Sequence, residues 1–161
     1  MNRFLLAALA ALMLCSADTR AGTLEDGVAA HQRGEYATAL GAFRVLAEEG
    51  NAAAQFNLGQ MYRLGQGVSM DPVEAARRYR QAAAQGDAQS QYNMGVMYFN
   101  AEGAPRNLVF SHMWLTLSAM SGVENAARNR TIVTREMTPE QITEALQLAR
   151  ICRQRNFKNC D

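Results

Sequence analysis

The sequence predicts an all-α protein, built as a right-handed α-solenoid in which antiparallel helix pairs stack along one axis. Two observations carry this prediction. The phrase "LGQMYRLGQGV" at residues 58–68 recurs as "MGVMYFNAEGA" at residues 94–104, an offset of 36 residues. A repeat of this period is typical of stacked supersecondary units. Turn residues divide each unit into two helical stretches, so about eight helices are expected in all.

Residues 1–21 have the features of a cleavable signal peptide. Arg3 gives a positive start, and residues 4–14 form an apolar run. This run is shorter than the roughly 20 apolar residues that a membrane-spanning helix needs. Small residues follow, and cleavage is expected after Ala17 or Ala21. We therefore expect a periplasmic or secreted protein that is not stably inserted in a membrane.

Cys15 lies at the end of the apolar run, where a lipid-modified cysteine would be found. The residue before it is Leu14, whereas the lipoprotein peptidase prefers a small side chain there. The sequence therefore favours removal of Cys15 with the signal peptide over a lipid-anchored form.

The mature chain, residues 22–161, is predicted to be a single helical-repeat domain. Its N-terminal unit, residues 22–50, has a first helix over about 24–33. A second helix follows the turn in "GEYATALGAF" at residues 34–43.

The first full repeat is expected over residues 51–86. Residues 52–64 have apolar spacing near 3.6 and end at the glycine turn "GQGV". Asp71 caps a second helix, Pro72 takes its first position, and Glu74 stands where a capping box needs it. That helix is expected to run to Gln85 and to stop at Gly86.

The second repeat, residues 87–122, matches the first at six structural positions. Glycine inside a helix costs about 1 kcal/mol relative to alanine, so a packing reason is expected. We predict close approach of the partner helix, which in the first repeat carries Ala75, Ala76, Ala82 and Ala83. The matched positions are Leu58 with Met94, Gly59 with Gly95, Tyr62 with Tyr98, Gly67 with Gly103, Asp71 with Asn107, and Gly86 with Gly122.

Residues 123–155 are predicted to close the array as a C-terminal helix pair, followed by a tail at 156–161. Thr138 caps the last helix, Pro139 opens it, and Gln141 completes a capping box. A terminal unit faces water on one side, so loss of the buried motif is expected there. Its positions are taken by Arg130, Thr131 and Thr134.

Cleavage of the signal would leave Cys152 and Cys160 as the only cysteines. An exported chain meets an oxidising environment, so we predict a disulfide between them. The chain-entropy model gives such a short loop at most about 2 to 3 kcal/mol. Two free thiols and an intermolecular bond are the alternatives.

The segment "AQFNLGQMYRLGQGVSMDPVEAARRYRQAAAQGDAQSQYNMGVMYFNAEG" resembles two consecutive Sel1-like repeats, which fold as antiparallel helix pairs of the tetratricopeptide superfamily. "HMWLTLSAMSG" and "MTPEQITEALQLAR" are similar to the closing repeat and end helix of many bacterial members. "GEYATALGAF" is closer to an ordinary tetratricopeptide unit. "AEGAPRN" departs from the usual double-glycine turn. The resemblance implies a protein-interaction scaffold and does not name the partner.

The resemblance also implies that the first helix of each pair lines a concave face. Phe56 and Tyr92 are equivalent there, and we expect the two rings to stack as part of a peptide groove. The alternative is that both rings pack between repeats as core. The candidate partner-binding residues are Phe56, Gln60, Arg63 and Leu64 from one repeat, Tyr92, Val96, Phe99 and Asn100 from the next, and Val28, His31 and Gln32 upstream.

No enzyme motif is recognisable. There is no G-x-S-x-G, and the single lysine, Lys158, excludes S-x-x-K. His31 and His112 stand alone, so no metal site and no cofactor are expected. The formal net charge of +1 gives no argument for nucleic acid. The methionines at helical spacing are expected to fill the core: Met61, Met94, Met97, Met113 and Met120.

These observations predict a non-catalytic adaptor of the bacterial cell envelope that binds a peptide or protein segment. A glycan or peptidoglycan binder that uses the same groove is an alternative, because aromatic rings also stack on sugars. An envelope hydrolase of the cysteine-rich Sel1-like type would need an acid such as Glu102, for which the sequence offers no paired residue. Weak homo-oligomerisation through the uncovered first helix stays open.

Overall fold

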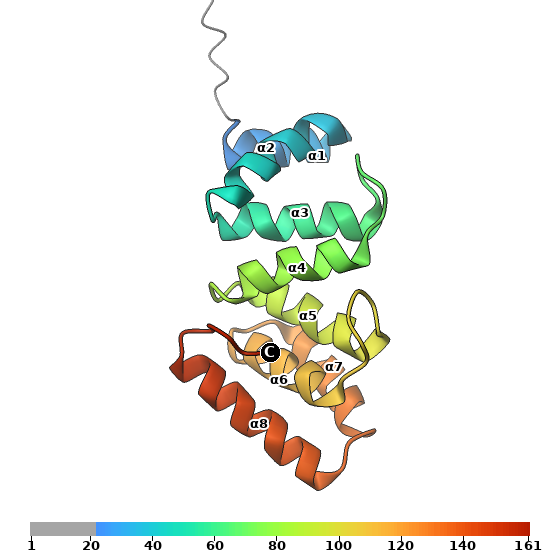
Figure 1. Ribbon diagram of the computed structural model, residues 1–161, viewed down its shortest axis with the longest axis vertical. Helices are drawn as coiled ribbons and strands as arrows, with labels where there is room; N and C mark the ends of the chain where they lie inside the picture. Colours follow the sequence, from blue (N-terminus) through green and yellow to red (C-terminus); the bar gives the residue numbers. More distant parts are fainter. Residues whose placement is uncertain (1–21) are drawn as a thin grey trace, which may run out of the picture.

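The computed structural model describes residues 22–161. Within this range all regular structure is helical, and the helices stack one above another along a single long axis (Figure 1). The predicted all-α solenoid is confirmed. The eight helices are α1 (Leu24–Gln32), α2 (Tyr36–Glu48), α3 (Ala52–Leu64), α4 (Pro72–Ala83), α5 (Ala88–Asn100), α6 (Leu108–Met120), α7 (Glu124–Thr134) and α8 (Pro139–Gln154).

The predicted capping residues mark the helix starts. Asp71 accepts hydrogen bonds from the amides of Val73 and Glu74, both at 3.0 Å. Asn107, 36 residues later, caps α6 through the amide of Phe110 at 3.0 Å. At α8 the predicted capping box of Thr138 and Gln141 is present. These side chains satisfy amides that no helical carbonyl can reach.

The predicted capping box at α4 is wrong. The Glu74 carboxylate accepts from Arg77 at 2.6 Å and from Arg78 at 2.7 Å instead of turning back to the cap. Two guanidinium groups one turn along the helix are stronger partners than a single amide. The helix also ends at Ala83, two residues before the predicted Gln85.

The glycines inside the helices permit close packing of the partner helix, as predicted. The group that packs on each glycine is a large side chain, whereas alanines had been expected there. A Cβ at Gly59 would lie 2.9 Å from the Tyr79 ring, and one at Gly95 would lie 2.6 Å from Cγ of Leu115. Gly27 has the same relation to Phe43, at 2.7 Å. In all three helix pairs, including the N-terminal unit, a large side chain of the second helix therefore packs on a glycine of the first helix.

Buried glutamines join successive units. The side-chain amide of Gln55 donates to the backbone carbonyl of Ala47 at 3.1 Å. The side-chain amide of Gln91 donates to the backbone carbonyl of Ala83 at 3.4 Å. The two donors, Gln55 and Gln91, are 36 residues apart, and so are the two acceptors, Ala47 and Ala83. Each bond ties the first helix of a repeat to the end of the preceding helix pair.

The turn "AEGAPRN" keeps the conformation of its glycine-rich counterpart. Ala101 has φ 57°, in the left-handed region, where the equivalent Gly65 has φ 67°. Gly103 then passes so close to α4 that an added Cβ would lie 2.1 Å from the carbonyl oxygen of Pro72. The loop holds this path despite the cost of an alanine at positive φ.

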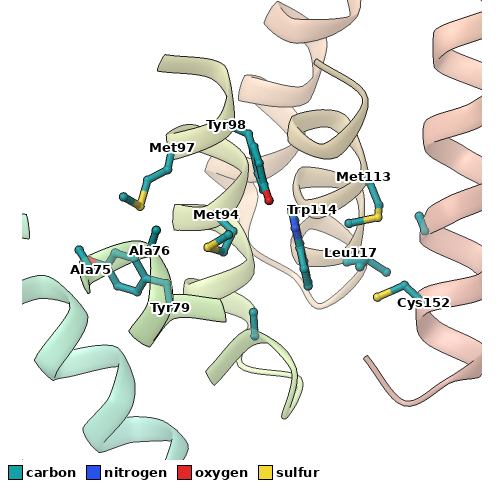
Figure 2. Packing of buried hydrophobic residues seen from close by; sticks show 12 residues of the cluster. Ala75, Ala76, Tyr79, Met94, Met97, Tyr98, Met113, Trp114, Leu117 and Cys152 are labelled. Atoms are coloured by element: carbon teal, nitrogen blue, oxygen red, sulfur yellow. The ribbon is translucent and has the colours of Figure 1, made fainter. Parts of the chain in front are cut away.

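The largest core cluster lies between α4, α5, α6 and α8 (Figure 2). Met94, Met97 and Met113 are fully buried in it, as predicted for core-filling methionines. Met61 is buried in a second cluster between α1, α2 and α3. Met120 was predicted to be core but is 56% exposed at the end of α6.

The C-terminal region departs from the repeat plan. Residues 123–155 do contain two helices, but α8 makes its main contacts with α6 rather than with α7. Figure 1 shows α8 below α6 at the lower end of the stack, and the chain after α8 returning across α6. The predicted disulfide between Cys152 and Cys160 is present. None of the helices formed by residues 22–161 is long and apolar enough to cross a membrane.

Candidate partner-binding site

A pocket of about 200 Å³ opens between α5, α6 and α7. Three of the predicted partner-binding residues, Val96, Phe99 and Asn100, come together at this pocket. Residues from α6 and α7 complete it. The lining residues are Val96, Phe99, Asn100, Leu115, Asn129, Ile132 and Val133.

The pocket combines a buried apolar floor with an accessible rim. Leu115 and Val133 are almost completely buried, whereas Ile132 is 49% exposed. An apolar side chain of a ligand placed here would cover Ile132 and would itself be removed from water. Burial of apolar surface is favourable by about 25 cal/mol per Å². The geometry therefore suits one aliphatic or aromatic side chain of a ligand.

The side-chain amides of Asn100 and Asn129 are the polar groups that line the pocket. The Asn129 side chain donates to the Tyr92 hydroxyl at 3.1 Å, which fixes its orientation and leaves its oxygen as an acceptor. Asn100 is exposed at the end of α5. An asparagine side chain can both donate to and accept from a peptide group, so these residues can bond to a ligand backbone.

Arg106 contacts Phe99, one of the lining residues, and was not predicted. Its guanidinium lies 5.2 Å from the centroid of the Phe99 ring and donates to the Phe99 carbonyl at 3.1 Å. It also donates to Glu136 at 2.6 Å. Sequence reasoning missed Arg106, Asn129 and Ile132 because they lie outside the two matched repeats or in a turn, where the 36-residue pattern gives no signal.

The predicted stacking of Phe56 on Tyr92 is wrong. The Phe56 ring instead approaches Tyr79, with centroids 6.0 Å apart. Tyr92 packs beside Phe99 against the buried cluster of Leu115, Ala126 and Val133. Both rings are half-buried, because each fills the space between neighbouring helices. The alternative, packing between repeats, describes them better than an open groove does.

The other predicted residues on α3 lie apart from the pocket. Arg63 donates to Glu102 at 2.8 Å, which raises the pKa of the guanidinium and ties α3 to the turn after α5. Glu102 is therefore the counterion of Arg63. Gln60 is half-buried, and Leu64 is 62% exposed.

The upstream residues form a separate contact. His31 Nε2 lies 2.7 Å from Oε1 of Gln66, and its ring meets the Tyr36 ring edge-on. Val28 packs against the second core cluster, and Gln32 is exposed. None of these side chains reaches the pocket between α5 and α7.

Burial leaves His112 uncharged near neutral pH. It lies on α6 with Nδ1 3.4 Å from the Thr116 hydroxyl. Burial, with the nearby charge of Arg130 as a smaller cause, lowers the pKa of His112 to about 4. Across residues 22–161, no three His, Cys, Asp or Glu side chains gather in a way that could hold a metal ion.

This stack of helix pairs, with its interior glycines and 36-residue contacts, defines a protein of the tetratricopeptide-like helical-repeat class. The family model for the Sel1 repeat matches residues 52–87 and 88–123. The chain therefore contains two consecutive Sel1 repeats. No curated protein matches it significantly.

The solved structures that are similar to this chain include the following two. One is a protective antigen present in uropathogenic Escherichia coli strains that displays an SLR fold, with 28% identity, a TM-score of 0.79, and coverage of 85% of this chain and 30% of that one. The other is a Sel1 repeat protein from Oxalobacter formigenes, with 28% identity, a TM-score of 0.69, and coverage of 81% and 55%. The chain spans less than two thirds of either protein. Repeats of this family generally serve as scaffolds for protein–protein interaction and are typically non-catalytic.

Proposed function

We propose that this protein is a non-catalytic adaptor outside the cytoplasm and that it binds a protein or peptide segment in the pocket between α5 and α7. The observation that carries the proposal is the combination of a buried aliphatic floor, an exposed Ile132 and two side-chain amides at one opening. Interaction sites typically centre on such an apolar pocket with a polar rim.

The disulfide supports the proposed location. Cys152 and Cys160 are bonded, and disulfides persist mainly in oxidising compartments. The apolar run at residues 4–14, on which the predicted export signal rests, lies outside the described residues. A periplasmic or secreted adaptor is consistent with both features.

Peptide binding fits the pocket better than sugar binding. Stacking on a sugar needs an accessible ring face, but Phe56 and Tyr92 are half-buried between helices. The pocket itself presents aliphatic carbon and amides, which suit an apolar side chain and its peptide backbone.

The experiment is capture of partners from a cell-envelope extract, with Ile132→Asp as the test variant. Leu146→Asp on α8 is the matched control, because Leu146 is 45% exposed and similar in size but lies away from the pocket. A carboxylate at position 132 would be desolvated by an apolar ligand. We expect the wild type and Leu146→Asp to retain the partner, and affinity for the purified partner to fall at least about tenfold in Ile132→Asp.

Equal capture by both variants would contradict the pocket as the site. Capture of an envelope polymer, and of no protein, would contradict protein binding and support the glycan-binding alternative. Circular dichroism checks that both variants are folded.

A further inference from the structure

The end of the chain shows how a repeat can hold a carboxylate. The Asp161 side chain is only 3% exposed and lies against the second repeat. Its carboxylate accepts from the Tyr98 hydroxyl at 2.5 Å, from Arg80 Nε at 3.1 Å and from the Trp114 ring nitrogen at 3.4 Å. Arg80 also donates to the Tyr98 hydroxyl at 3.0 Å.

The geometry explains why this site accepts an anion. Figure 2 shows the Tyr98 hydroxyl and the Trp114 nitrogen directed toward one another from α5 and α6. Burial and the bond to Asp161 raise the pKa of Tyr98 to about 12, so the phenol keeps the proton that it donates. Three donors surround one buried carboxylate, and each bond to an ionised group is stronger than a neutral one.

A second contact of the same segment lies at the turn between α4 and α5. The Phe157 ring packs on Gly86, where an added Cβ would lie 3.2 Å from the ring. The disulfide between Cys152 and Cys160 encloses Phe157 and precedes Asp161. The segment therefore docks through an aromatic ring and, four residues later, a carboxylate.

Two parts of this footprint recur 36 residues earlier, where α2 meets α3, and are uncovered there. Arg44 donates to the Tyr62 hydroxyl at 3.3 Å, and both residues are 36 positions before Arg80 and Tyr98. Gly50 is 36 positions before Gly86, and nothing lies within 4 Å of its potential Cβ. Within residues 22–161 no carboxylate is bonded to Arg44.

The neighbouring α4 surface adds positive charge to the uncovered copy. Arg77 and Arg78 occupy the positions that Met113 and Trp114 occupy in the second repeat. The apolar pair on α6 belongs to the cluster covered by α8, whereas Arg77 is exposed on α4. Glu74 offsets part of this charge by pairing with both arginines. The chain's own tail lies at the second repeat because α8, which precedes it, packs on α6.

We propose that the surface formed by Arg44, Gly50 and Tyr62 binds a partner segment that has an aromatic residue followed four positions later by an acidic residue. The aromatic ring would cover Gly50, and the carboxylate would bond Arg44 and the Tyr62 hydroxyl. Glu48 and Glu49 flank Gly50, so a basic residue beside the aromatic ring is favoured. This surface is separate from the pocket between α5 and α7, and the proposal does not depend on that pocket.

The test uses a synthetic peptide with the sequence of residues 152–161, "CRQRNFKNCD", acetylated, amidated and oxidised to its disulfide. It carries Phe157, Lys158 and Asp161 in the loop that the chain itself uses. The readout is NMR of the ¹⁵N-labelled protein, followed at the Gly50 amide and the Arg44 side-chain Nε–H. We expect saturable shifts at both groups, and the same shifts in Ile132→Asp.

The controls isolate each half of the footprint. Replacing the peptide's Asp by Asn or its Phe by Ala should weaken binding about tenfold, and so should Arg44→Gln in the protein. Tyr62→Phe removes only the hydroxyl and should weaken binding in the same direction. Arg128→Gln, which removes another exposed charge, on α7, should leave binding unchanged. No shift at millimolar peptide, or equal binding of the Asp and Asn peptides, would overturn the proposal.

Discussion

The two Sel1 repeats share their interior and differ in what lies on their surface. Both place a large side chain over an interior glycine and bond a buried glutamine to the preceding unit. On α4, an exposed Arg77 and a buried Arg78 take the positions at which α6 presents Met113 and Trp114 to the cluster that α8 covers. Residues that recur at the 36-residue period form the shared interior. Residues that differ between the repeats determine which segment packs on each of them.

The largest expected effect breaks the shared interior. Gly95→Leu should destabilise the protein by about 3 kcal/mol, and Gly59→Leu by about 2 kcal/mol, through overpacking. The order follows from the surroundings. A Cβ at 95 would lie 2.6 Å from Leu115 and 3.1 Å from the Ser111 carbonyl oxygen, which is backbone, whereas the three atoms nearest to a Cβ at 59 all belong to the Tyr79 side chain. Chemical denaturation measures both. An unchanged unfolding midpoint, or a larger loss at Gly59, would refute the packing account.

The next effect concerns the covered surface. A variant with both Cys152→Ser and Cys160→Ser should lose about 2 kcal/mol, since its unfolded chain is less restricted. Amide hydrogen exchange should become faster at Gly86, on which Phe157 packs, and stay unchanged at the uncovered Gly50. Equal changes at the two glycines would show that the disulfide does not act locally on the second repeat.

A difference in acid sensitivity is expected between the repeats. His112 takes the position of Ala76, and its pKa in the folded protein is about 4, below its ordinary value of 6.5. As the pH is lowered, His112 is therefore protonated in the unfolded chain before it is protonated in the folded protein. The free energy of unfolding falls by about 2 kcal/mol as the pH drops from about 6.5 to 4. His112→Gln should flatten this part of the pH profile. Persistence of the full slope in that variant would assign it to other groups.

The smallest effect concerns the two equivalent turns. Ala101→Gly should stabilise the protein by about 0.5 to 1 kcal/mol, because glycine adopts positive φ without strain. Gly65→Ala, the reverse change in the first repeat, should destabilise by a similar amount. Thermal unfolding of the pair checks this, and a destabilised Ala101→Gly would mean that strain is not what separates the turns.

Local signals account for the parts of the fold that could be predicted. Asp71, Pro72 and Thr138 mark helix starts through contacts with nearby residues, so their roles are visible in the sequence. The glycine contact of the N-terminal unit was missed because Gly27 lies 32 residues before Gly59, off the 36-residue offset. Its helix pair has a shorter turn, and the pattern is broken there.

Long-range contacts account for most of what could not be predicted. The half-buried state of Phe56 depends on Tyr79 from the next helix, which periodicity alone does not specify. The path of α8 depends on the apolar surface of α6, and the position of Asp161 depends on the disulfide that precedes it. Of the predicted binding residues, Val96, Phe99 and Asn100 share the pocket because they lie on one face of a single helix.

The most direct test of the comparison is the NMR spectrum of the arginine side-chain Nε–H groups in the wild type and in Asp161→Asn. Because Arg80 donates to Asp161 and Arg44 does not, the variant should shift the Arg80 signal and leave the Arg44 signal in place. A shift at Arg44, or none at Arg80, would contradict the claim that an equivalent carboxylate site lies 36 residues earlier and that only the site at Arg80 is filled.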